Sequence, residues 1–118
     1  MRFAVRLRPA ALAGQYRLEE LTVGLLGMAF KAGSDDPRSS LSYKVKKLLA
    51  FRAKDVLTTD PYITDDPALV PLDEVISRSD ILILCTPHEV YRDLMFRDKI
   101  VVDIWNFWSG RQVRRAAA

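Results

Sequence analysis

Apolar residues occur along the chain in short continuous runs that alternate with stretches of helical spacing, and this alternation predicts the fold. The run LTVGLLG at 21–27 ends at a glycine and is typical of a strand buried on both faces. Three further runs, DVLTTDP at 55–61, DILILCT at 80–86 and KIVVDIW at 99–105, predict three more strands. Strands that alternate with helical segments at this spacing indicate a parallel sheet with right-handed crossovers.

An amphipathic helix is predicted from Leu41 onward. Apolar residues recur there at i, i+4, i+7 and i+8, and lysines occupy the opposite face. Asp36 followed by Pro37 suits the start of this helix, as an N-cap and a first helical residue, and Ser39 or Ser40 is an alternative cap.

The remaining connections are shorter, with a helix predicted around Leu72–Ser77 and one or two helical turns over Pro87–Leu94. Together these elements predict an α/β, Rossmann-like fold, with a parallel sheet of about four to six strands and flanking helices. Ligands of such sheets bind outside the carboxyl ends of the strands. The residues expected at that edge are Phe30, Lys31, Asp60, Pro87, His88 and Trp105.

A chain of 118 residues has the size of one domain with one hydrophobic core. No repeat or linker divides it, so we expect an α/β domain over 20–110, an N-terminal arm or helix over 1–19, and a basic tail over 111–118. With 49% hydrophobic and 28% charged residues, the composition is that of an ordinary globular protein.

A cytoplasmic location is expected. The apolar runs are far shorter than a bilayer span requires. Arg6, Arg8 and Pro9 interrupt the apolar stretch that a secretory signal needs. The single cysteine, Cys85, cannot form an internal disulfide, as is common in a reducing compartment.

The net charge of +3 comes from the ends of the chain. Residues 1–17 hold four arginines and residues 111–118 hold three, whereas residues 18–110 hold 11 basic and 15 acidic groups. The body is therefore acidic, and it lacks a basic face with interleaved aromatic residues, so the sequence disfavours nucleic-acid binding.

Two cations after the first predicted strand are candidate ligand contacts. Lys31 follows that strand in a loop and can reach a phosphate as a point charge, or it can be a solvated lysine. Arg38 can clamp a diphosphate, or it can pair with Asp35 or Asp36, which are better suited to capping and loop ordering than to binding a metal.

The other polar and aromatic candidates can have structural roles instead of ligand contacts. Cys85 lies within an apolar run and is interpreted as a buried, inert thiol. His88 suits ligand contact or helix capping, since no activated nucleophile accompanies it. Trp105 belongs with Phe107 and Trp108 to an aromatic cluster that can stack on a base or partner, or be buried under the N-terminal segment. The pair Gly24 and Gly27 lacks the third glycine of a dinucleotide fingerprint.

The string VGLLGMAFKAGSDDPRSS at 23–40 resembles the start of the C-terminal, UDP-binding domain of the UDP-glucose/GDP-mannose dehydrogenase family. VLTTDPY at 56–62, SDILILCTPHEVYRDL at 79–94 and IVVDIWN at 100–106 resemble its later strands, in the same order. The string F-K-x-x-x-D-D-x-R is the specific part of this resemblance.

Family members oxidise the C6 hydroxyl of a nucleotide sugar to a carboxylate, in two hydride transfers to NAD. The resemblance implies that Phe30 and Lys31 face a UDP-sugar or a related nucleotide sugar, and that Arg38 reaches toward NAD across an interdomain cleft. It also implies NAD-binding and helical domains as partners in the complete enzyme, and a possible homo-oligomer.

This chain departs from the family pattern at three points. Ser39 replaces a glutamate, and Trp105 stands where UDP-glucose members often have a substrate-binding arginine. The motif around the family's catalytic cysteine lies upstream of this domain and does not occur here, and Cys85 is not its equivalent. The prediction is therefore a nucleotide-sugar-binding domain without catalytic residues of its own, present as a fragment, a truncated product or a separate subunit. The alternatives are a stand-alone Rossmann-like binding or regulatory module, and a dehydrogenase piece that binds NAD directly.

Overall fold

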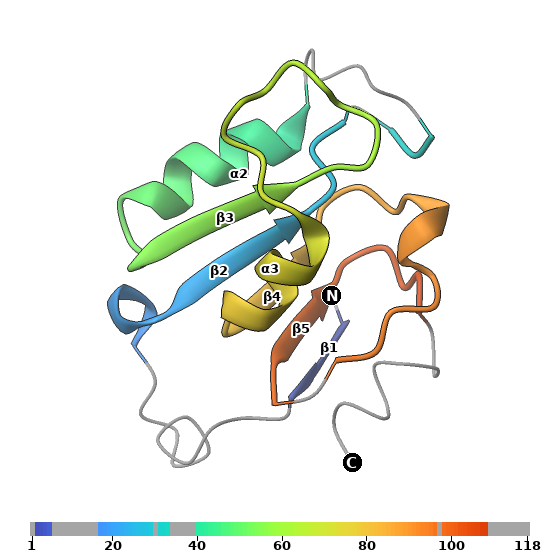
Figure 1. Cartoon of the computed structure of the whole chain (residues 1–118). Helices are drawn as coiled ribbons and strands as arrows, with labels where there is room; N and C mark the ends of the chain where they lie inside the picture. Colours follow the sequence, from blue (N-terminus) through green and yellow to red (C-terminus); the bar gives the residue numbers. More distant parts are fainter. Residues whose placement is uncertain (1, 6–16, 30, 34–39, 97, 109–118) are drawn as a thin grey trace.

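The sheet of the molecule has five strands in the order β1-β5-β4-β2-β3 (Figure 1). A computed structural model describes residues 2–5, 17–29, 31–33, 40–96 and 98–108. The strands are β1 (Arg2–Val5), β2 (Thr22–Leu26), β3 (Asp55–Thr59), β4 (Ile81–Leu84) and β5 (Ile100–Asp103). The helices are η1 (Leu18–Glu20), α2 (Leu41–Ala50), α3 (Leu72–Arg78) and η2 (Glu89–Tyr91), of which η1 and η2 are 3₁₀ helices.

Strands β2 to β5 are parallel, which confirms the predicted α/β fold. Each of the four predicted strands is present, and the helices predicted from residue 41 and around residues 72–77 are α2 and α3. The helical turn predicted after β4 is the short η2. Strands β2 and β4 are neighbours although β3 lies between them in sequence, so the chain reverses its direction of winding at this pair. Such a reversal opens a crevice at the carboxyl edge of the sheet.

Strand β1 differs from the expectation of an arm or helix over residues 1–19. Residues 2–5 pair antiparallel with β5, with Arg2 opposite Asp103 and Val5 opposite Ile100. An edge strand has unpaired backbone N–H and C=O groups, and β1 satisfies those of β5. Residues 6–16 and the predicted basic tail at 111–118 lie outside the described residues, so the proposed domain boundaries stay predictions.

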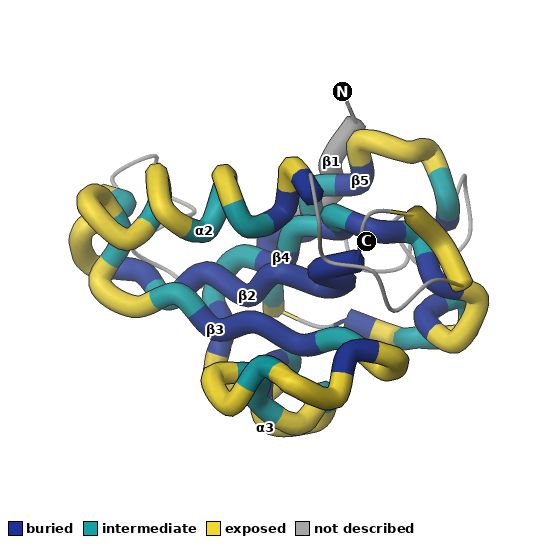
Figure 2. The backbone as a smooth tube through the Cα atoms, turned by 90° about the horizontal axis from the view of Figure 1, so that it is seen from above, coloured by how far each residue is buried: buried dark blue, intermediate teal, exposed yellow. Residues whose placement is uncertain are grey.

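Helices α2 and α3 cover opposite faces of the sheet (Figure 2). Alternate residues of β2 serve the two faces: Val23 and Leu25 belong to the apolar cluster under α2, and Leu26 belongs to the cluster under α3. Both clusters are therefore built from strands whose two sides are buried, as the continuous apolar runs predict.

Gly24 allows α3 to lie close against β2. A Cβ atom at this position would be 2.3 Å from Ser79 Oγ and 2.7 Å from Val75 Cγ1. The glycine is thus a packing residue. In the part of the chain that the structure describes, no helix is long and apolar enough to cross a membrane.

Candidate functional site

The loop that follows β2 divides into a buried half, Gly27–Ala29, and an exposed half, Lys31–Gly33. Gly27 has a φ of +91°, and a Cβ atom there would lie 2.5 Å from Thr86 Cβ. Its backbone N–H donates to the Thr59 carbonyl at 2.9 Å. The loop therefore leaves β2 through a tight turn that is pressed against the ends of β3 and β4, a path that glycine alone adopts without strain.

Asp60, the first residue after β3, holds the buried half of the loop. Its Oδ2 accepts hydrogen bonds from the backbone N–H of Met28 at 2.8 Å and of Ala29 at 3.0 Å. Its Oδ1 accepts from the backbone N–H of Tyr62 at 2.8 Å and of Ile63 at 3.1 Å. One carboxylate thus joins two loops that follow neighbouring parallel strands.

His88 extends this arrangement to the loop that follows β4. Its Nε2 is 2.8 Å from Asp60 Oδ2, and both side chains are fully buried. The backbone N–H of Gly33 donates to His88 Nδ1 at 3.0 Å. The imidazole therefore connects the exposed half of the loop after β2 to the Asp60 carboxylate.

The hydrogen bonds decide the charge state of Asp60. Burial by itself raises the pKa of this carboxyl, but the hydrogen bond from His88 and those from the backbone N–H groups of Tyr62, Met28 and Ile63 outweigh it and lower the pKa from 3.8 to about 2. Asp60 is consequently an ionised structural anchor at neutral pH and not a general acid.

The carbonyl of Ala29 ties the loop to two further segments. Thr86 Oγ1 donates to it at 2.8 Å, and Ser40 Oγ donates to it at 3.4 Å. Ser40 also caps α2 by accepting from the backbone N–H of Ser42 at 3.1 Å, so it is the cap of this helix among the alternatives that the sequence left open.

Lys31 lies in the exposed half of the loop, at the carboxyl edge of the sheet. It is exposed and forms no ion pair with any residue that the structure describes, and an ammonium in such a position can contact an anionic ligand. Phe30 and Arg38 lie outside the described residues, as do Asp35 and Asp36. Their predicted roles stay predictions.

Trp105 follows β5 at the same edge and is 55% exposed. Its indole Nε1–H donates to the Cys85 carbonyl at 3.1 Å, which places the ring beside the end of β4. Trp108, by contrast, is fully buried and donates from Nε1 to the Tyr91 carbonyl at 2.8 Å. The predicted aromatic cluster therefore separates into one exposed ring and a packed pair, because Phe107 contacts Trp108 edge to face at a centroid distance of 5.7 Å.

Cys85 is partly buried on the α2 side of the sheet, where it packs against the apolar cluster. Burial raises the pKa of its thiol to about 11, and the side chain of Ser42 counteracts this effect in part. A thiol with this pKa is protonated at neutral pH, which supports its interpretation as an inert core residue.

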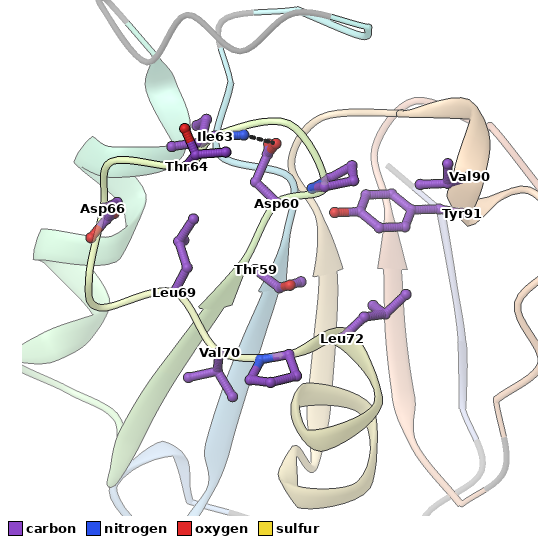
Figure 3. Close-up of a pocket in the computed structure, with 12 residues that line it drawn as sticks. Thr59, Asp60, Ile63, Thr64, Asp66, Leu69, Val70, Leu72, Val90 and Tyr91 are labelled. Carbon is purple, nitrogen blue, oxygen red and sulfur yellow. Dashed lines mark hydrogen bonds between the residues drawn. The ribbon is translucent and has the colours of Figure 1, made fainter.

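A separate pocket of about 420 Å³ lies on the α3 side of the edge, between the loop after β3 and η2 (Figure 3). Its lining includes Asp60 and Asp66 but neither Lys31 nor Trp105. It has no cationic lining residue, so it is poorly suited to a phosphate. We therefore place the candidate anion site at Lys31 and not in this pocket.

Among the residues that the structure describes, those after β2 do not form the cradle of a directly bound dinucleotide. In that cradle the helix N-terminus directly follows a short glycine turn, whereas α2 begins at Leu41, beyond the loop. The Asp60 carboxylate, which has the place of a ribose-binding acid, is occupied by internal donors. Within the described residues, no group of three or more His, Cys, Asp and Glu side chains is placed to hold a metal ion.

Comparison with known proteins agrees with this architecture. The model of the UDP-glucose/GDP-mannose dehydrogenase family, UDP binding domain, matches residues 24–110. The chain belongs to this family.

Relatives in the family include dehydrogenases of several nucleotide sugars. The chain is 30% identical over 93 residues to UDP-N-acetyl-D-mannosamine dehydrogenase of Pyrococcus horikoshii, an alignment that covers 71% of this chain and 21% of the relative. It is 28% identical over 107 residues to NDP-N-acetyl-D-galactosaminuronic acid dehydrogenase of Ralstonia nicotianae, covering 82% of this chain and 25% of the relative. The chain thus spans about a quarter of the length of these relatives.

Solved structures show the same fold. A UDP-glucose dehydrogenase from Pyrobaculum islandicum superposes with a TM-score of 0.67 at 28% identity, covering 91% of this chain and 25% of that one. A ternary complex of GDP-mannose dehydrogenase from Pseudomonas aeruginosa superposes with a TM-score of 0.65 at 26% identity, covering 83% and 27%. The resemblance stated from the sequence is therefore confirmed, and the chain corresponds to the UDP-binding domain of the family.

Sequence reasoning missed the hydrogen-bonded group formed by Asp60, His88 and Gly33. It listed Asp60 and His88 as edge residues, but it did not predict that they contact each other. The available signal was their common position, since each follows a parallel strand and such strand ends meet at one edge.

Proposed function

We propose that this domain binds the nucleotide part of a UDP-sugar, as the nucleotide-sugar-binding domain of an NAD-dependent nucleotide-sugar 6-dehydrogenase. The observation that supports this most is the placement of Lys31 and Trp105 on either side of the end of β4. The loop of Lys31 is attached to His88, and the indole of Trp105 is attached to the Cys85 carbonyl. A cation and an exposed aromatic ring thus belong to loops that follow the two strands beside β4.

Each of these groups suits a different part of the ligand. The ammonium of Lys31 attracts the diphosphate, and the hydrogen bonds of its loop limit how far it moves. The half-exposed indole of Trp105 offers a π-face on which a uracil ring can stack. We assign Phe30 to the same nucleotide sugar because it adjoins Lys31 in the sequence.

The oxidation itself requires groups that the described residues do not supply. In the complete enzyme, NAD would supply the hydride acceptor for the sugar C6. We propose that Arg38 reaches toward that cofactor from this domain, and that the chain by itself binds nucleotide without turnover. The chain's contribution is then to hold and orient the diphosphate end of the substrate.

Calorimetric titration of the chain with UDP, GDP and NAD tests the proposal. UDP is expected to bind more tightly than GDP or NAD. Preferential binding of NAD would favour a domain that holds the dinucleotide directly, and absence of binding to all three would favour a stand-alone module with another ligand.

Tryptophan fluorescence tests the base contact separately. Trp105 is exposed and Trp108 is fully buried, so iodide quenches only the emission of Trp105. UDP should quench this same part of the emission. The Trp105→Phe variant should lose this quenching and keep the emission of Trp108. Unchanged quenching in this variant would contradict stacking on Trp105.

A further inference from the structure

We infer that His88 is a positioning residue that holds Lys31 in place for the nucleotide, an inference that rests on the proposed function. Lys31 lies two residues before Gly33, and the Gly33 N–H donates to His88 Nδ1 at 3.0 Å. Within the described residues, this hydrogen bond attaches the exposed half of the loop to the sheet edge. Loss of this contact therefore frees the segment that carries the ammonium.

The contacts of His88 define the role of each ring nitrogen. Because Nδ1 accepts the N–H of Gly33, it carries no proton, and the ring proton is on Nε2. Nε2 then donates to Asp60 Oδ2 at 2.8 Å. Asp60, which is fixed by four backbone N–H groups, thus holds the proton on Nε2 and leaves Nδ1 free to accept from the loop.

Aromatic packing fixes the orientation of the imidazole. The rings of Tyr62 and Tyr91 contact it edge to face, with centroid distances of 4.9 Å and 5.8 Å. The side chains of His88 and Asp60 are both fully buried. Bulk water cannot replace a lost partner at such a site, so the hydrogen bonds tolerate few alternative arrangements.

Two substitutions at His88 separate its two hydrogen bonds. In His88→Asn, the side-chain oxygen takes the place of Nδ1 and can still accept from Gly33, but nothing reaches Asp60. In His88→Gln, the terminal amide takes the place of Nε2 and can still donate to Asp60, but the acceptor for Gly33 is lost. The two variants are therefore matched controls for each other.

Calorimetry with UDP on the full chain gives the first readout. His88→Gln is expected to bind UDP about tenfold more weakly than the wild type, and His88→Asn within about threefold of it. Because His88 acts through Lys31, the effect of His88→Gln should nearly vanish in a Lys31→Ala background. A merely structural role of His88 would weaken binding equally in both backgrounds.

The exchange rate of the Gly33 amide hydrogen, measured by NMR, gives a second readout that does not depend on nucleotide. It should rise in His88→Gln and stay close to the wild-type rate in His88→Asn. If the wild type binds UDP but the two His88 variants weaken binding equally, the positioning role is overturned and the proposed function stands. If the wild type does not bind UDP, the proposed function fails and so does the claim about affinity. An unchanged Gly33 exchange rate in His88→Gln would then also contradict the inference that His88 attaches the loop through Gly33.

Discussion

Two buried aspartates, each at the carboxyl end of a parallel strand, organise different parts of the site edge. Asp103 at the end of β5 accepts from the backbone N–H groups of Trp105, Phe107 and Trp108, all within five residues of it. Asp60 after β3 accepts from its own turn and also from residues 28, 29 and 88. One aspartate shapes a local turn, and the other joins three loops that are distant in sequence.

This difference shows how a domain can hold a surface loop in a defined position. A local cap orders only the residues next to it, whereas a carboxylate with donors from several segments orders their relative positions. The loop that carries Lys31 needs the second kind of support, since the nucleotide that we propose as its ligand lies between elements.

The largest expected effect comes from replacing the two aspartates. Asp60→Asn should lower the free energy of unfolding by about 4 kcal/mol, because the new amide NH₂ faces N–H donors in a fully buried place. Asp103→Asn should cost less, about 2 kcal/mol, because its donors belong to one turn. Urea unfolding followed by circular dichroism measures both, and equal losses would contradict the distinction between local and bridging anchors.

The next largest effect is expected from glycine substitutions that compare the stability of the two halves of the loop after β2. Gly27→Ala should destabilise the domain by about 2 to 3 kcal/mol, because it adds a Cβ that clashes with Thr86 at a φ of +91°. Gly33→Ala should cost about 1 kcal/mol, since its φ of +75° is strained but the space around it is open. The same unfolding assay checks the pair. A loss for Gly33→Ala as large as that for Gly27→Ala would show that the outer half is packed as tightly as the inner half.

A titration of Asp60 tests whether the hydrogen bond from His88 lowers the pKa of this carboxyl. The carboxyl ¹³C resonance should titrate near pH 2 in the wild type and at a higher pH in His88→Asn, which lacks the donor to Asp60. Because the folded pKa lies below the unfolded value, the stabilisation is present above about pH 3.8 and is lost as the pH falls through about 2. The loss amounts to about 2 kcal/mol. An unchanged midpoint in His88→Asn would show that His88 does not lower the pKa of Asp60.

The sequence predicts the sheet well because burial on two faces leaves continuous apolar runs. Strands β2 to β5 and helices α2 and α3 follow from such runs and from the spacing after Leu41. Strand β1 does not, because a four-residue edge strand is decided by the free backbone groups of β5 and not by its own composition.

The site is predictable in its location but not in its contacts. Position after a strand was enough to select Lys31, His88 and Trp105 as edge residues. The bond between His88 and Asp60 joins residues 28 positions apart. It depends on β4 lying beside β2 and not beside β3, which no local pattern encodes. The exposure of Trp105 and the burial of Trp108 likewise depend on the turn held by Asp103.

The proposed function requires that Lys31 binds the diphosphate of a nucleotide at this edge. Calorimetric titration of UDP into the wild type, Lys31→Ala and Lys47→Ala tests it most directly, because Lys47 is an exposed lysine of α2 and its replacement changes the net charge equally. We predict that Lys31→Ala weakens UDP binding by about tenfold or more, while Lys47→Ala binds like the wild type. Equal affinities of Lys31→Ala and Lys47→Ala for UDP would contradict the claim.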